Sequence, residues 1–255
     1  NPQAGVLDPK RLEGFEAVVH LAGDDLAGGR WSRAKKVRIR ESRVAGTQLL
    51  CRTLAQLSHP PHVLASDSAV GFYGNRFEEE LTEESAPGSG FLAEVCQEWE
   101  TATRAAVAKG IRVVLMRFGV VLSMGGGALE KMLWPFRLGL GGRLGDGKQY
   151  WSWIAIEDAV RAIKHVLDMA DLAGAVNVVS PEPVTNLEFT KTLGQTLARP
   201  TFFAVPRFAA RLAFGEMADE ALLSSARVQP VKLLAGSFEF RHPHLNRTLR
   251  LLLSR

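Results

Sequence analysis

Basic side chains are the first residues in this sequence whose types and spacing suggest chemistry. Seven Lys or Arg residues fall within 14 positions, from Arg30 to Arg43, and Glu41 is the only acid among them. Such a cluster can bind nucleic acid, attract a phosphorylated ligand, or form the solvated face of a helix. No nucleic-acid-binding module accompanies it. We therefore expect no nucleic-acid partner and leave the other two interpretations open.

A second group combines cations with aromatic rings on the long segment between Arg117 and Glu157. Loops at the carboxyl ends of parallel strands are where ligands bind in α/β proteins. Cations interleaved with aromatic rings at such a place can hold a planar or phosphorylated substrate. The sequence therefore suggests Arg137, Lys148 and Trp153 as substrate contacts, and the alternative is a lid that packs on itself.

Two patterns resemble a phosphate-binding loop and a metal site, but the residues around them do not support either function. The stretch from Gly142 to Lys148 matches most of a phosphate-binding loop, but Gln149 replaces the hydroxyl residue and no strand precedes the stretch. The paired histidines that flank Pro60-Pro61 and Pro243 have no cysteine or carboxylate neighbours at metal-binding spacing. We expect neither a nucleoside triphosphatase nor a metal site.

The elements that would position these residues alternate in type along the chain. Apolar runs predict strands at residues 17–21, 63–66, 111–117 and 175–179, and helical spacing predicts helices at 33–57, 91–109, 157–169 and 187–198. This alternation predicts a Rossmann-type, doubly wound α/β fold with a parallel sheet. After Pro200 the pattern changes to short helical pieces and one strand, Ser237–Phe240. We expect one domain over residues 1–200, with a lid insert at about 123–155, and a small C-terminal cap over 201–255.

The bulk composition excludes several classes of protein. The chain of 255 residues is 46% hydrophobic and 23% charged, as in globular domains, and its net charge is +4. It has no apolar run of about 18 residues, the length that a membrane span needs. The two cysteines are too few for a disulfide framework. These features predict a cytoplasmic protein with no membrane partner.

Five segments share features with one known family and follow one another in its order: Val18–Gly23, Ser66–Gly74, Arg117–Leu122, Trp153–Asp158 and Gly174–Asn186. Together they resemble the extended short-chain dehydrogenase/reductases, the group that includes the nucleotide-sugar epimerases. Two further segments, Leu133–Gly142 and Gly215–Ala218, resemble the YfcH-like, atypical branch of this family, which has a mammalian relative described as an NADP-dependent oxidoreductase.

The resemblance implies an NADP site, with NAD as a less favoured cofactor. The residues it places around the nicotinamide half are at three strand ends, and the basic cluster adds two cations that could reach phosphates. They are Leu21, Ala22, Gly23, Ser66, Arg117, Phe118, Gly119 and Val120, together with Arg40 and Arg43.

The family's proton relay is only partly present. A tyrosine normally moves the proton, and a lysine four residues later lowers its pKa from about 10. In this sequence those two positions fall on Leu92 and Cys96, and the helix asparagine of the family falls on Arg43. Ser68 matches the active-site serine, whose hydroxyl can donate to a substrate carbonyl or cap the backbone.

The proton donor and the activity are therefore open. Tyr73 is a substitute proton donor or a packed aromatic, and Cys96 is expected in the core. The resemblance implies an oxidoreductase or epimerase acting on a carbonyl compound or nucleotide sugar. A non-catalytic NADP(H)-binding protein is the alternative.

The same resemblance implies a segment before Asn1. The family's pyrophosphate-binding glycines belong to a βαβ unit of roughly 50 residues that would precede this sequence. We expect the longer protein to hold that half of the cofactor. The strand at residues 17–21 would then pair with it instead of forming a bare apolar edge.

Overall fold

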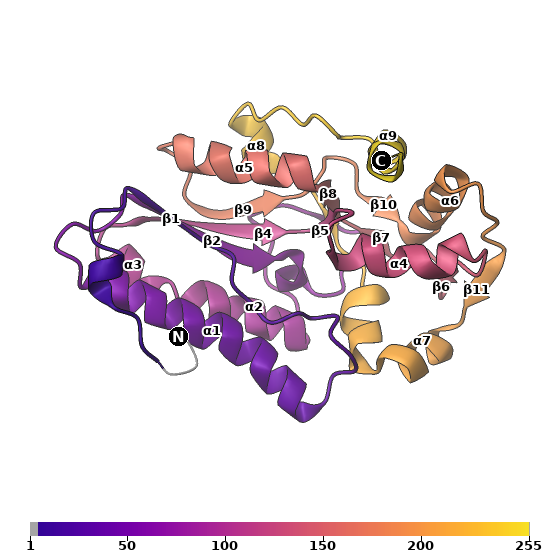
Figure 1. The fold of residues 1–255 in the computed structure, drawn as a ribbon, viewed down its shortest axis with the longest axis horizontal. Coiled ribbons are helices and arrows are strands. Elements are labelled where there is room, and N and C mark those ends of the chain that lie inside the picture. Colours follow the sequence, from indigo (N-terminus) through magenta and orange to yellow (C-terminus); the bar gives the residue numbers. More distant parts are fainter. Residues whose placement is uncertain (1–4, 255) are drawn as a thin grey trace.

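A four-stranded parallel sheet forms the centre of the molecule (Figure 1). The computed structural model describes residues 5–254. The strands are β1 (Ala17–His20), β2 (Val63–Ala69), β4 (Arg112–Phe118) and β9 (Gly174–Val178), hydrogen-bonded in that order. The four predicted strands are confirmed, with shifts of one to three residues at their ends.

Helices cover both faces of this sheet, so the predicted doubly wound fold is confirmed. Helices α1 (Arg33–Ala55), α2 (Phe91–Thr101) and α3 (Arg104–Ala108) lie on one face. Helices α5 (Ile156–Asp168) and α8 (Val231–Ala235) lie on the other. The sheet pleat explains the two cores, because successive side chains point to opposite faces. Leu64 and Val113 pack toward α1 and α3, whereas Ala65 and Val114 pack toward α5.

The predicted helix over residues 91–109 is two helices. The chain breaks at Ala102–Thr103, where the Thr103 hydroxyl donates to the Glu100 carbonyl at 2.8 Å. Such a local side-chain bond competes with the helical ladder, which explains why propensity alone did not reveal the break.

The predicted lid insert forms the start of a second layer. Strand β5 (Val120–Leu122) pairs in parallel with β8 (Trp153–Ala155), and α4 (Gly127–Arg137) lies between them in sequence. Helix α4 packs with α6 (Asn186–Thr196) and α9 (Leu245–Leu253) around a core that includes Leu133 and Phe189.

Short strand pairs connect the C-terminal segment to the rest of the fold. Strand β11 (Phe203–Val205) pairs with β6 (Gly142–Leu144), and β12 (Arg227–Val228) pairs with β3 (Glu80–Leu81). Strand β10 (Val184–Thr185) pairs with β7 (Tyr150–Trp151). The remaining elements are η2 (Pro9–Arg11), η3 (Val70–Tyr73), α7 (Arg207–Phe214) and the π-helical turn η4 (Ala218–Leu222).

The predicted strand Ser237–Phe240 is wrong. The Phe238 N–H closes the end of α8 on the Leu233 carbonyl, 2.9 Å away. The N–H groups of Arg241 and His242 donate to the Asp158 carboxylate at 2.9 and 2.8 Å. These donors are committed to a helix end and a side chain, so no strand ladder forms. The apolar alternation reflects the packing of Phe238 and Phe240 near α5.

None of the helices in the described part of the chain combines the length and hydropathy that a membrane crossing requires. The division into residues 1–200 and 201–255 remains a prediction. Leu233 and Phe238 lie in the same core as β4 and α5.

Candidate functional site

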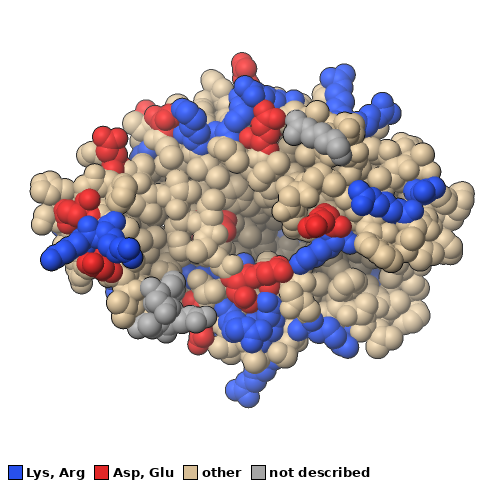
Figure 2. Space-filling view, in the orientation of Figure 1, with Lys and Arg blue, Asp and Glu red and all other residues tan. Residues whose placement is uncertain are grey.

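The carboxyl ends of β1, β2 and β4 lie side by side and form the floor of the candidate site. The parallel register pairs His20 with Ser66 and Ala69 with Phe118, so all three strands end on one edge. Beyond β1, Leu21 is 50% exposed, and Ala22 and Gly23 are exposed as well. Figure 2 shows the surface hollowed near the middle of this face, with charged side chains around the hollow.

Gly119 follows β4 at a point where only glycine fits. A Cβ there would lie 2.5 Å from the Ser152 carbonyl oxygen and 2.8 Å from Val179. The predicted cofactor residues Phe118, Gly119 and Val120 are therefore held tightly between β8 and β9. All three are half-buried.

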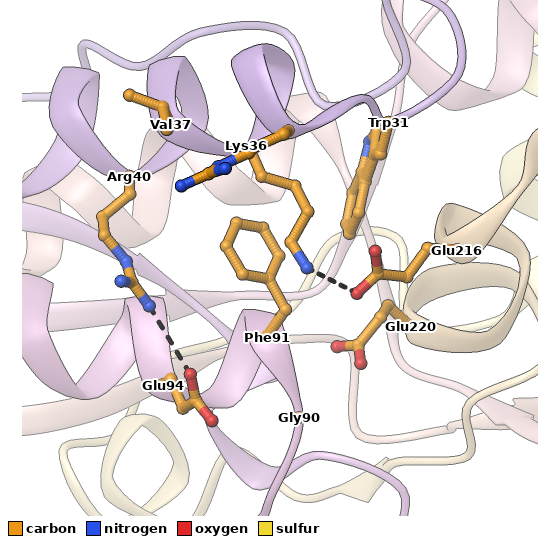
Figure 3. A pocket seen from close by; sticks show the side chains of 10 residues that line it. Trp31, Lys36, Val37, Arg40, Gly90, Phe91, Glu94, Glu216 and Glu220 are labelled. Atoms are coloured by element: carbon orange, nitrogen blue, oxygen red, sulfur yellow. Dashed lines mark hydrogen bonds and ion pairs between the residues drawn. The ribbon is translucent and has the colours of Figure 1, made fainter.

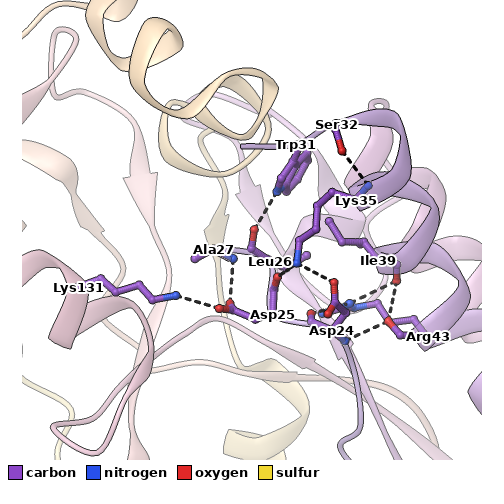
Figure 4. Close-up of polar contacts among 11 residues, drawn as sticks. Asp24, Asp25, Leu26, Ala27, Trp31, Ser32, Lys35, Ile39, Arg43 and Lys131 are labelled. Atoms are coloured by element: carbon purple, nitrogen blue, oxygen red, sulfur yellow. Dashed lines mark hydrogen bonds and ion pairs between the residues drawn. The ribbon is translucent and has the colours of Figure 1, made fainter. Parts of the chain in front are cut away.

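The loop after Gly23 is tied to α1 (Figure 4). The Asp24 N–H donates to Ser42 Oγ at 3.0 Å, and Lys35 Nζ pairs with the Asp24 carboxylate at 2.7 Å. Lys35 is buried, so this charge pair fixes the loop where an exposed pair would not. On the far side of the loop, Asp25 pairs with Lys131 of α4 at 3.0 Å.

Arg43 reaches from α1 to the edge of the sheet. Its Nη1 donates to the Asp24 carbonyl at 3.1 Å, and the guanidinium carbon lies 3.1 Å from the position a Cβ on Gly23 would take. Burial lowers the pKa of Arg43, and nearby acids, Asp67 first among them, oppose that effect. The structure therefore places Arg43 beside the predicted cofactor residue Gly23.

Asp67 is a site residue that the sequence analysis missed. It lies two positions before the end of β2, and its carboxyl group interacts electrostatically with Arg43 of α1. Burial raises the pKa of Asp67 to about 7, although Arg43 and the Ser68 N–H both favour the ionised form. A carboxyl group that titrates near neutral pH suits acid–base chemistry. The available signal was an acid between Ser66 and Ser68, near the end of the strand.

Ser68 belongs to a buried ion-pair network. Its hydroxyl donates to Glu100 Oε1 at 2.8 Å. Arg117 holds the same carboxylate with two hydrogen bonds of 2.8 Å, and its guanidinium stacks 3.5 Å from the centroid of the Phe72 ring. Ser68 is 1% exposed. This placement favours a structural role for the Ser68 and Arg117 side chains, and their catalytic and cofactor roles remain predictions.

Tyr73 continues this network away from the hollow. Its hydroxyl accepts from Arg117 at 2.9 Å and donates to Asn177 Oδ1 at 2.7 Å. Burial raises the pKa of Tyr73, and the nearby Arg117 only partly offsets this. Its side chain is fully buried and both hydroxyl bonds are made, which favours the packed-aromatic alternative.

The other predicted cofactor residues are either buried in the sheet or paired on the outer face of α1. Ser66 is fully buried inside the sheet, and its hydroxyl has no hydrogen-bond partner among the described residues. Arg40 pairs with Glu94 at 3.5 Å and Glu98 at 3.4 Å, both on α2. It lines an open pocket of about 680 Å³ between α1, α2 and η4 (Figure 3). In that pocket Lys36 also pairs with Glu216, at 2.7 Å. Three of the seven basic residues of the cluster, Lys35, Lys36 and Arg40, therefore pair with acids.

The three predicted substrate contacts are separated from one another. Trp153 is fully buried in the core around α4 and α6, and its indole N–H donates to the Glu182 carbonyl at 2.9 Å. This favours the alternative of a lid packed on itself. Arg137, at the end of α4, and Lys148 are both exposed.

The relay positions implied by the resemblance carry no proton donor. Leu92 and Cys96 lie on α2, 3.3 and 3.8 Å from where a Cβ on Gly71 would be. Burial raises the pKa of the Cys96 thiol to about 12, so it stays protonated and unreactive. Cys96 lies in the core, as expected.

The residues at this edge fit the nicotinamide half of a dinucleotide. Gly23 offers backbone without a side chain, and Arg43 covers it on one side. Residues 5–254 contain no G-x-G-x-x-G sequence, the fingerprint of the strand–turn–helix element that binds a pyrophosphate. The glycine-rich turn Gly125–Gly127, which joins β5 to α4, lacks that spacing. Nor do these residues contain a group of three or more His, Cys, Asp or Glu that could hold a metal ion.

Comparison with protein families gives two matches. The profile of the NAD dependent epimerase/dehydratase family matches residues 8–179. A domain of unknown function, DUF1731, matches residues 205–252.

Curated relatives match nearly the whole chain. An epimerase family protein of Mycobacterium bovis is 45% identical over 249 residues, which cover 98% of this chain and 82% of the relative. The epimerase family protein SDR39U1 of Homo sapiens is 34% identical over 242 residues, covering 94% of this chain and 82% of its own length.

Two solved structures resemble the fold closely. The crystal structure of human SDR39U1 (isoform 2) with NADPH has a TM-score of 0.91 and 33% identity, and covers 96% of this chain and 83% of its own. A nucleoside-diphosphate sugar epimerase from Corynebacterium glutamicum has a TM-score of 0.80 and 36% identity. The match covers 99% of this chain and 49% of that protein.

Proposed function

The chain belongs to the NAD dependent epimerase/dehydratase family, and from this premise we propose that it binds NADP(H) and acts as an oxidoreductase or epimerase. The observation that carries the proposal is the edge of the sheet, where Arg43 lies against Gly23 and its charge also acts on the Asp67 carboxyl group. The human relative solved with NADPH supports the choice of NADP(H) over NAD(H).

Each of these residues has a distinct part. The Leu21–Gly23 backbone lines the nicotinamide end of the site, and Arg43 places a positive charge beside it. The nicotinamide, when bound, supplies or accepts a hydride. During reduction of a carbonyl group, Asp67 gives its proton to the oxygen as negative charge develops there, and Arg43 stabilises the carboxylate left behind.

We assign the role of proton donor to Asp67 because the other candidate residues have no proton to transfer or use their hydroxyl group in other hydrogen bonds. Leu92 and Cys96 hold no transferable proton at neutral pH, and Tyr73 is committed to Asn177. Ser68 and Tyr73 remain in the proposal as groups that keep β2 and the start of η3 in place beside Asp67. Arg137 and Lys148 remain as proposed substrate contacts. The two cysteines, free and buried, support a cytoplasmic location.

The second candidate is a non-catalytic NADP(H)-binding protein. It is favoured by the same relay positions, because Leu92 and Cys96 cannot replace a tyrosine and a lysine. Fold alone does not separate the two candidates.

Calorimetry and kinetics on the full-length protein test the proposal. We expect NADPH to bind more tightly than NADH, and a panel of ketones and aldehydes to include a compound reduced with NADPH. Asp67→Asn should lower kcat by about 10²- to 10⁴-fold, the usual contribution of a positioned acid, while NADPH affinity stays nearly unchanged. Tight binding without turnover across the panel favours the second candidate. Absence of NADPH binding contradicts both.

A further inference from the structure

Large apolar side chains are exposed together at the end of the molecule formed by α4, β11 and α7 (Figure 1). Phe202 is 90% exposed, and Trp134, Phe208 and Leu212 are each 72% exposed. We call this the basic apolar surface, and its apolar members are Trp134, Leu138, Leu140, Phe202, Phe203, Phe208 and Leu212.

These residues come from adjoining segments. Strand β11 pairs with β6, so Phe203 lies opposite Gly142, two residues after Leu140. A Cβ on Gly139 would lie 3.7 Å from the Pro200 ring, which brings the end of α4 next to the start of the β11 segment. Helix α7 begins two residues after β11. The exposed side chains therefore lie on neighbouring elements.

Helix α7 has little contact with the core. Ala210 is its only buried residue. Phe208 and Leu212 are four residues apart, so they share one exposed face, and Arg207 and Arg211 are spaced in the same way beside them. Packing within the chain therefore does not account for the apolar face of this helix. Exposed apolar patches of this kind mark interaction sites.

The charge of this end is positive. Residues 131–150 and 187–222 carry eight Lys or Arg and five acids, a net charge of +3, which is most of the +4 of the whole chain. Arg207 and Arg211 pair with Asp146 and Asp219. The other arginines of these two segments have no ion-pair partner among the described residues; they are Arg137, Arg143 and Arg199. In Figure 2 the end over α4 and α7 shows Lys and Arg in blue and few acids.

The combination of exposed apolar side chains and positive charge indicates which kind of partner can bind the basic apolar surface. In a symmetric contact with a second copy, the same cationic patch would face itself, and like charges would repel. An anionic lipid surface attracts the arginines, while the aromatic and aliphatic side chains enter the boundary between headgroups and acyl chains. Arginine suits such a boundary because its stem is apolar and its head is charged.

We propose that the basic apolar surface binds peripherally to membranes that contain anionic lipids, with Phe202, Phe208 and Leu212 entering the interface. Such binding needs no membrane-spanning helix. It revises the sequence-based expectation of no membrane partner, which rested on the lack of a span. The Leu21–Gly23 backbone and Arg43 belong to other elements, so the nicotinamide edge of the sheet lies outside this surface. Arg137, a proposed substrate contact, lies on the surface itself.

Vesicle co-sedimentation of the full-length protein tests the proposal. We expect binding to vesicles of mixed phosphatidylcholine and phosphatidylglycerol, little binding to phosphatidylcholine alone, and release as salt rises from about 0.1 to about 1 M, where charges are screened within about 3 Å. Brominated lipids should quench part of the tryptophan fluorescence, and Trp134→Phe should remove that part.

Variants separate the apolar contribution to vesicle binding from the electrostatic one. Phe208→Ser with Leu212→Ser should weaken vesicle binding at least about tenfold, and Arg137→Glu with Arg143→Glu should weaken it at low salt only. Val107→Ser with Val160→Ser, which changes exposed apolar residues elsewhere, should have no effect. Circular dichroism melts check that each variant folds.

Three outcomes overturn the proposal. One is equal binding to neutral and anionic vesicles, and another is no vesicle binding at any salt. The third is a concentration-dependent dimer in sedimentation velocity that Phe208→Ser abolishes, because the surface then binds a second copy. Binding to an acidic protein segment without binding to vesicles is a form of the second outcome.

Discussion

Replacing Asp67 with asparagine should change how the stability of the protein depends on pH. The raised pKa of about 7 means that the folded chain keeps a proton on Asp67 that the unfolded chain has lost. Below about pH 4 the carboxyl is protonated in both states, so it adds no pH dependence. Between about pH 4 and about pH 7 the unfolded chain binds fewer protons, so the free energy of unfolding falls as pH rises.

The magnitude follows from the size of the shift. The pKa of Asp67 rises from an ordinary value near 3.9 to about 7, which is a shift of about three units. Each unit corresponds to about 1.4 kcal/mol. Ionisation of Asp67 should therefore cost the folded state up to about 4 kcal/mol above pH 7, with the loss complete once pH exceeds the folded pKa. Asparagine has no charge at any of these pH values, so the variant should lack this component.

Urea denaturation of both proteins between pH 4 and pH 8 measures the difference. We expect Asp67→Asn to gain stability relative to wild type as pH rises, by a few kcal/mol. Asp171→Asn is the matched control, because Asp171 is exposed. Parallel pH profiles for wild type and Asp67→Asn would refute the reasoning, since Asp67 would then titrate alike in the folded and unfolded chains.

Four further predictions concern the neighbouring charges and the site. Glu100→Gln should lower the free energy of unfolding by about 3–5 kcal/mol, because it leaves Arg117 buried without a counter-charge; a urea midpoint close to wild type would contradict this. Arg43→Ala should weaken NADPH binding at low salt and flatten its salt dependence, measured by calorimetry between about 0.05 and about 0.5 M salt; identical slopes would show that Arg43 does not face the cofactor. Turnover on UDP-sugars should be poor, since the tyrosine–lysine relay is missing, and steady-state rates near about 10 s⁻¹, typical of enzymes, would contradict that. In any reaction that is found, Ser68→Ala should lower kcat through displacement of β2, and unchanged kinetics would leave Ser68 without a role.

The sequence was sufficient for the sheet and its helices, because buried parallel strands are continuous apolar runs that need no knowledge of distant residues. It was insufficient where a side chain depends on partners far along the chain. Tyr73 is fixed by Asn177, 104 positions away, and Trp153 is buried by α4 and α6.

Only part of the candidate site could be predicted from the sequence. The backbone positions around Gly23 and Gly119 follow from the resemblance, because they depend on the strand ends alone. Asp67 does not, since its pKa depends on how deeply the fold buries it. No local pattern reports that burial, although an acid between Ser66 and Ser68 was visible in the sequence.

The pairing of β12 with β3 has a consequence for how the chain is made. Glu83, just after β3, accepts hydrogen bonds from the backbone N–H groups of Asn177 and Lys232, both at 3.1 Å. A nascent chain that has emerged only as far as residue 200 therefore contains β9 but lacks Leu233 and Phe238. These two residues complete the core beside α5. The apolar face of that nascent chain remains open to other chains and to chaperones during that interval. Since closure waits for these long-range contacts, synthesis that stalls near Pro200 should yield a species prone to aggregation rather than a folded N-terminal domain.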